Sequence, residues 1–223
     1  VAKIYAGGFA PHGNIFDQLR IDYERQAFSW IGDFKDLALG YITFASTIHA
    51  RVSNSIPKPV GSFTVGASSS GKTQFLETLC ALFPEEMILN LTTASSRSFI
   101  YQCKEDPYFL NGKVVFVEEM AGLQDEELQY LLRTLVTKGS ARHTTVLGGS
   151  VQVFDIIAGI SLQSTGLKQD ILREDTMNRM VIFNSDDSND MTDRVVDSIK
   201  KRYMSRAGAS TAFPLYKEFF RGL

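Results

Sequence analysis

The sequence predicts an α/β protein built around a mostly parallel five-stranded sheet. Short apolar runs alternate along the chain with segments whose apolar residues recur at helical spacing, and a glycine-rich segment separates the first run from the helix after it. Apolar residues make up 44% and charged residues 22% of the 223 residues, which is the composition of an ordinary globular chain and not of a disordered one. A core that covers both faces of such a sheet is therefore available.

Proline and glycine positions divide the chain into three predicted parts. Residues 14–30 and 35–52 have helical spacing, and Pro57 and Pro59 then favour an extended chain, so we expect a helical lead-in over residues 1–57. An α/β core follows over residues 58–186. Residues 187–223 are expected to form a small, lid-like helical part. It would contain a helix over residues 191–206, with acids at its start and bases at its end, and an amphipathic helix from about Pro214.

Within the core, strands and helices are expected to alternate. The predicted strands cover residues 60–65, 87–91, 113–117, 156–162 and 180–183, and the predicted helices cover residues 72–82, 95–105, 125–138 and 167–175. One interval breaks this order, because residues 141–147 and 150–155 are strand-like and meet at Gly148-Gly149, a pair that tolerates the positive φ angles of a tight turn. We expect a β-hairpin inserted before the fourth strand.

Charge and cysteine content narrow the classes of function. Lys and Arg number 23 against 25 Asp and Glu, so the chain has no overall basic excess and any DNA contact must be local. Two cysteines and three histidines lack the spacing of a disulfide framework or a metal site, which favours a reducing, cytoplasmic setting, and Cys80 is expected to be a small core residue.

No membrane segment is expected. Residues 37–50 are the most apolar stretch, but they are too few and too polar to span a bilayer. The chain starts at Val1 without an initiator Met or a basic segment leading to a cleavage site, so we expect no signal peptide and a piece of a longer protein.

Residues 66–73 match the phosphate-binding pattern G-x-x-x-x-G-K-[ST]. The pattern follows an apolar strand and precedes an amphipathic helix, where backbone N–H groups can surround a phosphate at the positive end of the helix. Lys72 is expected to neutralise the β- and γ-phosphates of ATP, and Thr73 to ligate Mg²⁺. The alternative is a flexible serine-rich turn with an ordinary helix cap. The predicted ATP-binding residues are Gly66, Ala67, Ser68, Ser69, Ser70, Gly71, Lys72 and Thr73.

A second apolar strand, over residues 113–117, ends in two carboxylates and looks like a Walker B motif. A carboxylate at the end of a buried strand can lie beside the phosphates, so Glu118 is assigned to the Mg²⁺ and Glu119 to the attacking water. The first acid of that motif is usually Asp, so the two roles are open to exchange. Alternatively, both acids do no more than favour the start of the next helix.

The order of these parts resembles a known family. A phosphate loop, a strand ending in Glu-Glu, a hairpin before the fourth strand, and Asn178-Arg179-Met180 before the fifth strand are similar to the AAA+ ATPases of the presensor-hairpin branch. That branch includes superfamily 3 viral helicases and minichromosome-maintenance helicases. Residues 91–92, 98–101 and 118–122 most closely resemble the ATPase part of primase–helicase replication proteins of phages, plasmids and mobile elements. The resemblance covers residues 60–185 and implies an AAA+ P-loop NTPase fold.

The resemblance also implies catalytic roles. Arg179 would be an arginine finger that reaches the γ-phosphate bound by a neighbouring subunit; Arg173 competes for this role, and a helix-capping surface arginine is the alternative. Gln163, in the polar group that ends the fourth strand, would be sensor 1 and orient the attacking water. Arg194 would be the lid arginine called sensor 2.

In the resembled helicases the inserted hairpin grips single-stranded DNA. Lys138, Arg142 and His143 near the hairpin base are therefore the expected DNA contacts, although the hairpin turn carries no cation. An edge hairpin kept soluble by its charges is the alternative. The bases at residues 200–202 are a further possible phosphate contact, or simply the basic end of a helix.

The function implied by the resemblance is that of an ATP-hydrolysing, Mg²⁺-dependent motor. It would assemble as a homo-oligomeric ring, a hexamer, and translocate on DNA as a replicative helicase alongside other replication proteins. A nucleotide-dependent loader or remodelling switch that separates no strands is the alternative from another class. A P-loop phosphotransferase is a third, less favoured because the Glu-Glu strand suits activation of water.

Overall fold

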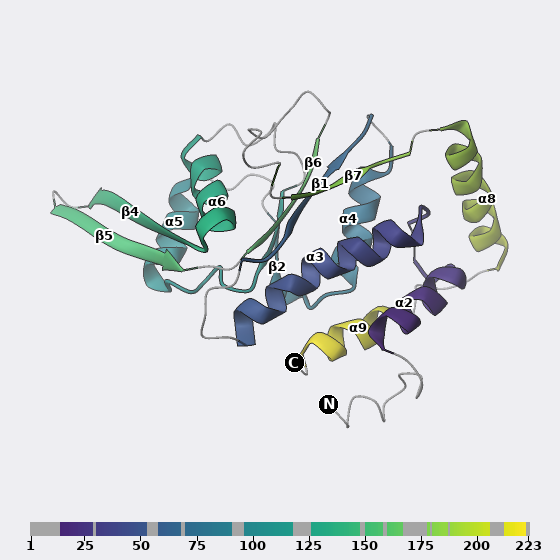
Figure 1. Ribbon diagram of the computed structural model, residues 1–223, viewed down its shortest axis with the longest axis horizontal. Helices are drawn as coiled ribbons and strands as arrows, with labels where there is room; N and C mark the ends of the chain where they lie inside the picture. The colour runs from purple at the N-terminus through teal and green to yellow at the C-terminus, as the bar shows by residue number, and fades with distance from the viewer. Residues whose placement is uncertain are drawn as a thin grey trace.

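The structure, a computed structural model, describes residues 14–28, 30–52, 58–67, 70–90, 96–117, 126–147, 150–157, 160–166, 178, 180–186, 188–205 and 212–221. Five strands form one sheet in the order β2-β3-β6-β1-β7, and each neighbouring pair is parallel (Figure 1). The predicted α/β class with parallel strands is confirmed. The strands are β1 (Gly61–Val65), β2 (Ile88–Asn90), β3 (Val114–Val117), β6 (Ser161–Gly166) and β7 (Met180–Asn184).

Both faces of the sheet are apolar, because alternate residues of a strand point to opposite sides. In β3, Val115 and Val117 belong to one hydrophobic cluster, whereas Val114 and Phe116 belong to the other. Helices α5 (Ser96–Glu105) and α6 (Glu126–Lys138) contribute to the first cluster, and helices α3 (Phe34–Val52) and α4 (Lys72–Ala81) to the second. Strand β3 therefore reads as an unbroken apolar run in the sequence, whereas β1 and β6 also bury polar side chains, those of Ser62, Thr64, Gln163 and Thr165. Cys80 packs against the second cluster, as predicted, and burial raises its pKa to about 12.

The inserted hairpin is present. Strands β4 (Ser140–Leu147) and β5 (Ser150–Ile157) pair antiparallel as a separate two-stranded sheet, which projects beyond α6 in Figure 1. Its Gly148-Gly149 turn lies outside the described residues, as does the predicted helix over residues 167–175.

The predicted strand over residues 156–162 is wrong in its limits. Ile156 and Ile157 are the last residues of hairpin strand β5, and the fourth strand of the sheet, β6, starts only at Ser161. Ile156 and Ile160 are buried in the same cluster, so the apolar pattern continues across the change from one strand to the next. As a result, Gln163 lies inside β6 and not at its end.

The first helix is shorter than the predicted segment 14–30. Helix α2 (Ile15–Glu24) starts at Asn14, whose side chain forms a capping box with Asp17, and it ends because Gln26 adopts a φ of 56°, outside the helical region. At the other end of the chain lie α8 (Asn189–Ser205) and α9 (Ala212–Arg221). Among the described helices, none is both long and apolar enough to cross a membrane.

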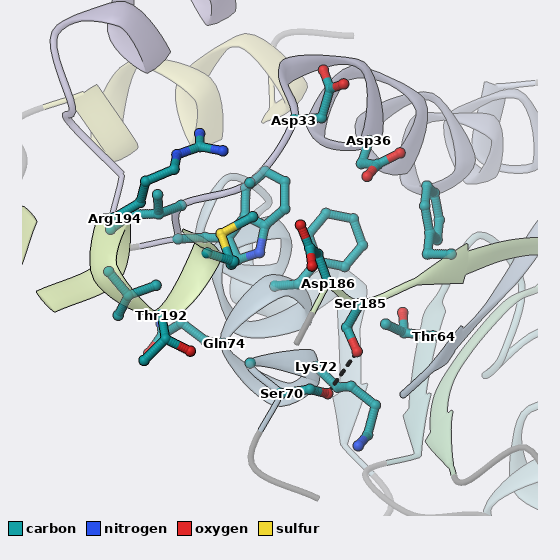
Figure 2. A pocket seen from close by; sticks show the side chains of 18 of the residues that line it. Asp33, Asp36, Thr64, Ser70, Lys72, Gln74, Ser185, Asp186, Thr192 and Arg194 are labelled. Atoms are coloured by element: carbon teal, nitrogen blue, oxygen red, sulfur yellow. Dashed lines mark hydrogen bonds between the residues drawn. The ribbon is translucent and has the colours of Figure 1, made fainter. Parts of the chain in front are cut away.

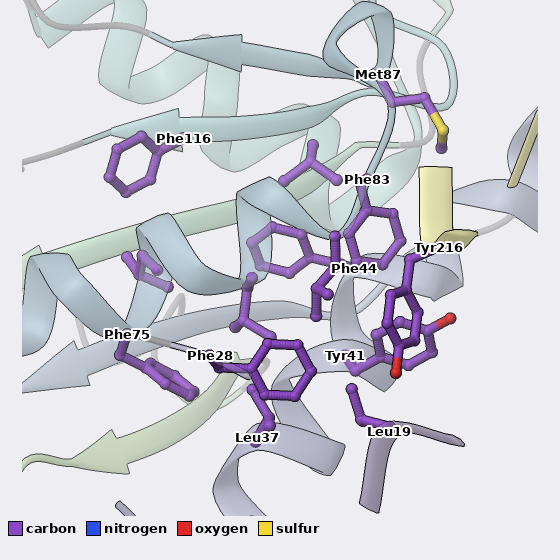
Figure 3. Packing of buried hydrophobic residues seen from close by; sticks show 14 of the residues in the cluster. Leu19, Phe28, Leu37, Tyr41, Phe44, Phe75, Phe83, Met87, Phe116 and Tyr216 are labelled. Carbon is purple, nitrogen blue, oxygen red and sulfur yellow. The ribbon is translucent and has the colours of Figure 1, made fainter. Parts of the chain in front are cut away.

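An aromatic cluster joins α9 to the N-terminal helices and to the core (Figure 3). Phe220 of α9 stacks on Phe83, with ring centroids 4.2 Å apart, and lies 5.6 Å from Tyr41 of α3. The ring centroid of Phe28 lies 6.3 Å from that of Tyr216 in α9. The division at residues 57/58 and 186/187 stays a prediction, but helices from all three predicted parts bury side chains in one cluster.

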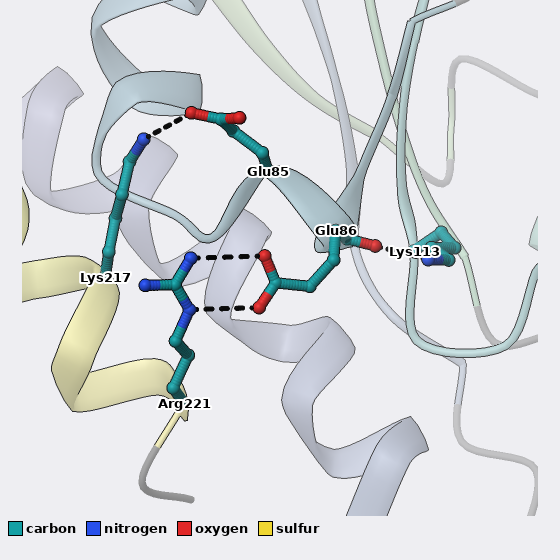
Figure 4. A network of polar contacts seen from close by, with 5 residues as sticks. All are labelled: Glu85, Glu86, Lys113, Lys217 and Arg221. Carbon is teal, nitrogen blue, oxygen red and sulfur yellow. Dashed lines mark hydrogen bonds and ion pairs between the residues drawn. The ribbon is translucent and has the colours of Figure 1, made fainter.

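Polar contacts fix the orientation of α9 (Figure 4). Lys217 pairs with Glu85 at 3.2 Å and Arg221 with Glu86 at 3.0 Å, in the short 3₁₀ helix η1 (Glu85–Met87). These pairs are on the surface and contribute little to stability. The buried contact matters more: the Tyr216 hydroxyl donates to Asp22 Oδ2 at 2.8 Å, and both side chains are buried.

Tyr216→Phe is expected to destabilise the fold, because it leaves the buried Asp22 carboxylate with one donor fewer. Gln18 still donates to Asp22 at 3.1 Å, so we expect a loss of about 1.5 kcal/mol, the lower end of the range for hydrogen bonds to charged groups. Urea unfolding of the parent and of the variant measures this difference in the free energy of unfolding. Tyr41→Phe is the matched control, since the buried Tyr41 hydroxyl has no hydrogen-bond partner among the described residues. Equal stability of the two variants would contradict the prediction.

Candidate functional site

The carboxyl ends of the parallel strands meet where β1 runs into the glycine-rich loop (residues 66–73). Val65 at the end of β1 pairs with Gly166 of β6 and with Asn184 of β7. Val117 at the end of β3 pairs with Ser164 of β6, so β6 lies between β1 and β3. Open α/β sheets bind ligands outside this edge. The loop therefore starts at the edge where a ligand is expected.

The two glycines of the loop are required for different reasons. A Cβ on Gly66 would lie 1.7 Å from Ser185 Oγ and 2.7 Å from Ser70 Oγ, so a side chain fits where the loop passes the end of β7 only if both hydroxyls move. Gly71 has a φ of 81°, which glycine adopts without strain. Close packing therefore favours glycine at position 66, and the positive φ angle favours glycine at position 71.

Lys72 starts α4 and turns back over the loop. Its Nζ donates to the carbonyl oxygens of Gly66, at 2.9 Å, and Ala67. Gly71 provides no side-chain cap to α4, and the first turn contains no acidic residue. The positive end of the helix therefore faces the loop, with the half-buried Thr73 next in the same turn. An ammonium group, a helix N-terminus and a hydroxyl in this arrangement fit a phosphate group.

Ser185 ties the end of β7 to the loop. Its backbone N–H donates to the Val65 carbonyl at 2.8 Å, and its Oγ lies 2.6 Å from Ser70 Oγ, as the dashed line in Figure 2 marks. No motif identifies Ser185 in the sequence. The available signal is the polar run over residues 184–187, directly after an apolar strand, at a position where parallel sheets place ligand-binding groups.

A cavity of about 1140 Å³ opens beside the loop (Figure 2). Three parts of the chain line it: the N-terminal part from Tyr23 of α2 to Asp36 of α3, Thr64 of β1 with the loop and the start of α4, and the end of β7 with α8. The Trp30 ring joins the N-terminal lining to the P-loop helix. Its centroid is 4.8 Å from that of the Phe75 ring in α4, and it lies against the backbone of Gly32. Val196 and Ile199 line the α8 side although they are 42% and 56% exposed. The cavity thus combines a cationic loop with aromatic and aliphatic walls.

Comparison with known proteins identifies the family. A family model described as the MTBMA_p00010 P-loop domain matches residues 34–223. The chain belongs to this family. A search of curated proteins finds no match to the chain. The matched residues include the glycine-rich loop over residues 66–73, which is the P-loop of this family, and the cavity walls formed by α4, β7 and α8. Membership of a P-loop family indicates nucleotide binding and NTPase activity in general.

Three carboxylates line the cavity: Asp33 and Asp36 on the α3 side, and Asp186 beside Ser185 (Figure 2). Burial raises the pKa of Asp36, and Asp33 raises it further, whereas Lys35 lowers it. The pKa of Asp186 is lowered, because the backbone N–H and the side chain of Ser188 hydrogen-bond to it. Carboxylates accept hydrogen bonds, so this wall favours a ligand that has hydroxyl or amino donors as well as phosphates.

The structure brings some of the predicted site residues together. Ala67, Ser70, Gly71, Lys72 and Arg194 line the same cavity, Arg194 from α8. Gln163, in contrast, is fully buried in β6, where the Ser62 hydroxyl donates to its Oε1. Other predicted residues lie outside the described part of the chain: Ser68, Ser69, Glu118, Glu119, Arg173 and Arg179.

The residues expected to contact DNA lie at the end of the molecule opposite α8 (Figure 1). Lys138 is exposed at the end of α6. Arg142 of β4 donates to Asp155, directly opposite on β5, at 2.8 Å and 3.4 Å, and this contact raises the pKa of Arg142. The side chain of His143 is outside the described residues. The charge of Arg142 is therefore already balanced by a carboxylate.

Gly66→Ala is expected to disrupt the P-loop, because its Cβ and Ser185 Oγ cannot occupy the positions they have here. A displacement costing more than about 1 kcal/mol corresponds to at least about fivefold weaker nucleotide binding. Ser185→Ala in the same chain removes the 1.7 Å contact, so the double variant should bind more tightly than Gly66→Ala alone. Titration with nucleotide measures both. If neither Ser185→Ala nor Ser185→Ala combined with Ser70→Ala gives recovery, the steric explanation is wrong.

Proposed function

We propose that this chain is the ATPase domain of a ring-forming AAA+ motor that moves on DNA, most simply as a replicative helicase. The observation that carries the proposal is the strand order β3-β6-β1 at the P-loop edge, with a hairpin inserted between α6 and β6. In that order, the end of β3 lies one strand away from the end of β1, where the P-loop begins. A carboxylate that follows β3 would then have room to hold a water molecule against the terminal phosphate.

Nucleotide binding would use groups that the P-loop edge already gathers. Lys72 would exchange its bonds to the loop carbonyls for bonds to the phosphates, which are stronger acceptors because they are charged. Thr73 and Glu118 would hold Mg²⁺, which neutralises phosphate charge when bound. Trp30 would provide an aromatic surface for the base, since it lines the cavity close to Phe75 of the P-loop helix.

Hydrolysis would depend on residues around the terminal phosphate. Glu119 would accept a proton from the attacking water, and Arg179 of a neighbouring subunit would stabilise the charge of the transition state. The hydrogen bond from Ser62 holds Gln163 inside the sheet, so an effect of Gln163 on the water would act through neighbouring groups.

A nucleotide-dependent loader or remodelling switch is the second candidate, and one contact favours it. Arg142 is paired with Asp155. Among the predicted DNA contacts, Lys138 is exposed and has no ion pair in the described region. The motor predicts that single-stranded DNA accelerates ATP turnover, whereas the switch predicts slow turnover independent of DNA. Steady-state ATPase rates with and without single-stranded DNA decide between them. A monomer that transfers phosphate to an acceptor would instead identify a phosphotransferase.

Lys72→Ala is expected to abolish tight ATP binding, because it removes the cation nearest to the phosphates and leaves the sheet intact. Glu119→Gln should retain ATP but lower turnover by about 10² to 10⁴, the usual contribution of a general base. Trp30 is the single tryptophan of the chain, so its fluorescence reports binding in both variants. Tight binding by folded Lys72→Ala would contradict the P-loop assignment, and an active Glu119→Gln with an inactive Glu118→Gln would exchange the two acids.

Arg179→Ala tests assembly and catalysis together. An arginine finger acts on the nucleotide of a neighbour, so ATP binding should persist while hydrolysis falls by about 10³ to 10⁵. Mixing Arg179→Ala with Lys72→Ala subunits should partly restore hydrolysis, because some interfaces then combine an intact P-loop with an intact finger. Mass measurements first establish that mixed oligomers form. No recovery in such oligomers, or full activity of a monomeric parent, would count against the ring motor.

A further inference from the structure

The second half of α6 and the hairpin after it form a locally basic part of the chain. Residues 130–154 contain no Asp or Glu, but they include two cations of α6, Arg133 and Lys138, and one of β4, Arg142. The whole chain, in contrast, has 25 acids against 23 bases. Gly139 ends α6 with a φ of 73°, so the chain passes directly from the helix into β4 (Figure 1). A basic excess that the chain as a whole lacks is therefore present at this end of the molecule.

Tyr130 lies at the centre of the solvent-facing side of α6 and is 61% exposed. Successive residues of a helix turn by about 100°, so Arg133 lies about 60° to one side of Tyr130 and Lys138 about 80° to the other. The opposite side of the helix is buried in the core through aliphatic side chains, those of Leu131, Leu132, Leu135 and Val136. Packing of α6 therefore uses the aliphatic side, and the side with the tyrosine and the two cations faces solvent.

Neither cation of this face is neutralised by an acid among the described residues. The Arg133 guanidinium instead lies over the Tyr130 ring, with its carbon 5.2 Å from the ring centroid. It covers one face of the ring only, and the rest of the exposed side chain remains accessible. The sequence places Glu126 and Glu127 one turn before Tyr130, so the acids of α6 are confined to its start. An anion is therefore attracted from Arg133 onward, towards the hairpin.

An exposed tyrosine between two cations has the chemistry that recognises a single strand of nucleic acid. Unpaired bases stack on aromatic side chains, and the phosphates of the strand contact cations. We propose that the face of α6 formed by Tyr130, Arg133 and Lys138 binds single-stranded DNA, with one base stacked on Tyr130 and phosphates at the two cations. The inference rests on the proposed movement on DNA and assigns a contact to α6, beside the hairpin. A duplex keeps its bases stacked on one another, so this face selects single strands.

Anisotropy of a fluorescein-labelled oligothymidylate, titrated with the full chain, tests the inference. Tyr130→Ala should weaken binding at least about fivefold, the lower limit for loss of one stacked base, whereas Tyr130→Phe keeps the ring and should bind like the parent. Arg133→Gln and Lys138→Gln should each reduce the slope of log affinity against log salt concentration by about 0.7, because each variant makes one phosphate contact fewer. A duplex of the same length should bind more weakly than the single strand.

Tyr108→Ala is the matched control for the aromatic contact. Tyr108 is 57% exposed, but Glu105 and Asp106 precede it, so its removal should leave the affinity for the oligothymidylate unchanged. Arg20→Gln is the control for the salt dependence. Arg20 is an exposed cation of α2 that pairs with Glu24 at 3.7 Å, so its removal should leave the slope unchanged.

Three results would overturn the inference: binding by Tyr130→Ala equal to that of the parent, an equal loss in Tyr108→Ala, or an unchanged salt slope in both cation variants of α6. If single-stranded DNA still binds to Tyr130→Ala and accelerates its ATP turnover, the contact on α6 is rejected and the motor is kept. If the parent binds no single-stranded DNA while ATP still changes its Trp30 fluorescence, both the contact and the motor are rejected, and nucleotide binding is kept.

Discussion

The close contact between Gly66, Ser70 and Ser185 is the constraint on which the site depends. The parallel pairing of β1 with β7 brings Ser185 to the carbonyl of Val65, and the absence of a side chain at Gly66 lets the P-loop pass over it. This position sets where α4 begins, and with it the direction of the helix dipole and the place of Lys72. The phosphate site is thus a consequence of sheet register as much as of the P-loop sequence.

The features that the sequence predicts well are those with local causes. A glycine-rich loop between a strand and a helix, apolar runs for strands such as β3, and two strand-like segments that pair as a hairpin each depend on neighbouring residues. Features that depend on distant residues were missed. The apolar pattern hides the start of β6, because Ile156 of β5 and Ile160 just before β6 are buried in one cluster, and the pairing of Arg142 with Asp155 follows from hairpin register. Trp30 and Ser185 become site residues only because the fold brings them to the P-loop.

The family match also divides the site. It starts at Phe34, the first residue of α3, so it includes the P-loop and α8 but not Tyr23, Trp30 or Ile31. Two contacts hold this part of the chain against the matched region: the Trp30 ring lies 4.8 Å from that of Phe75, and α2 is tied through Asp22 to Tyr216 of α9. The phosphate end of the cavity thus belongs wholly to the family match, whereas part of its aromatic end comes from the residues before it.

The exposed aliphatic face of α8 has a thermodynamic consequence. Val196 and Ile199 line the cavity while remaining in contact with solvent, so a ligand that fills the cavity would displace ordered water from apolar surface. Removal of apolar surface from water lowers the heat capacity of the system. The enthalpy of nucleotide binding should therefore become more favourable as temperature rises, and the affinity would vary less with temperature than either its enthalpy or its entropy.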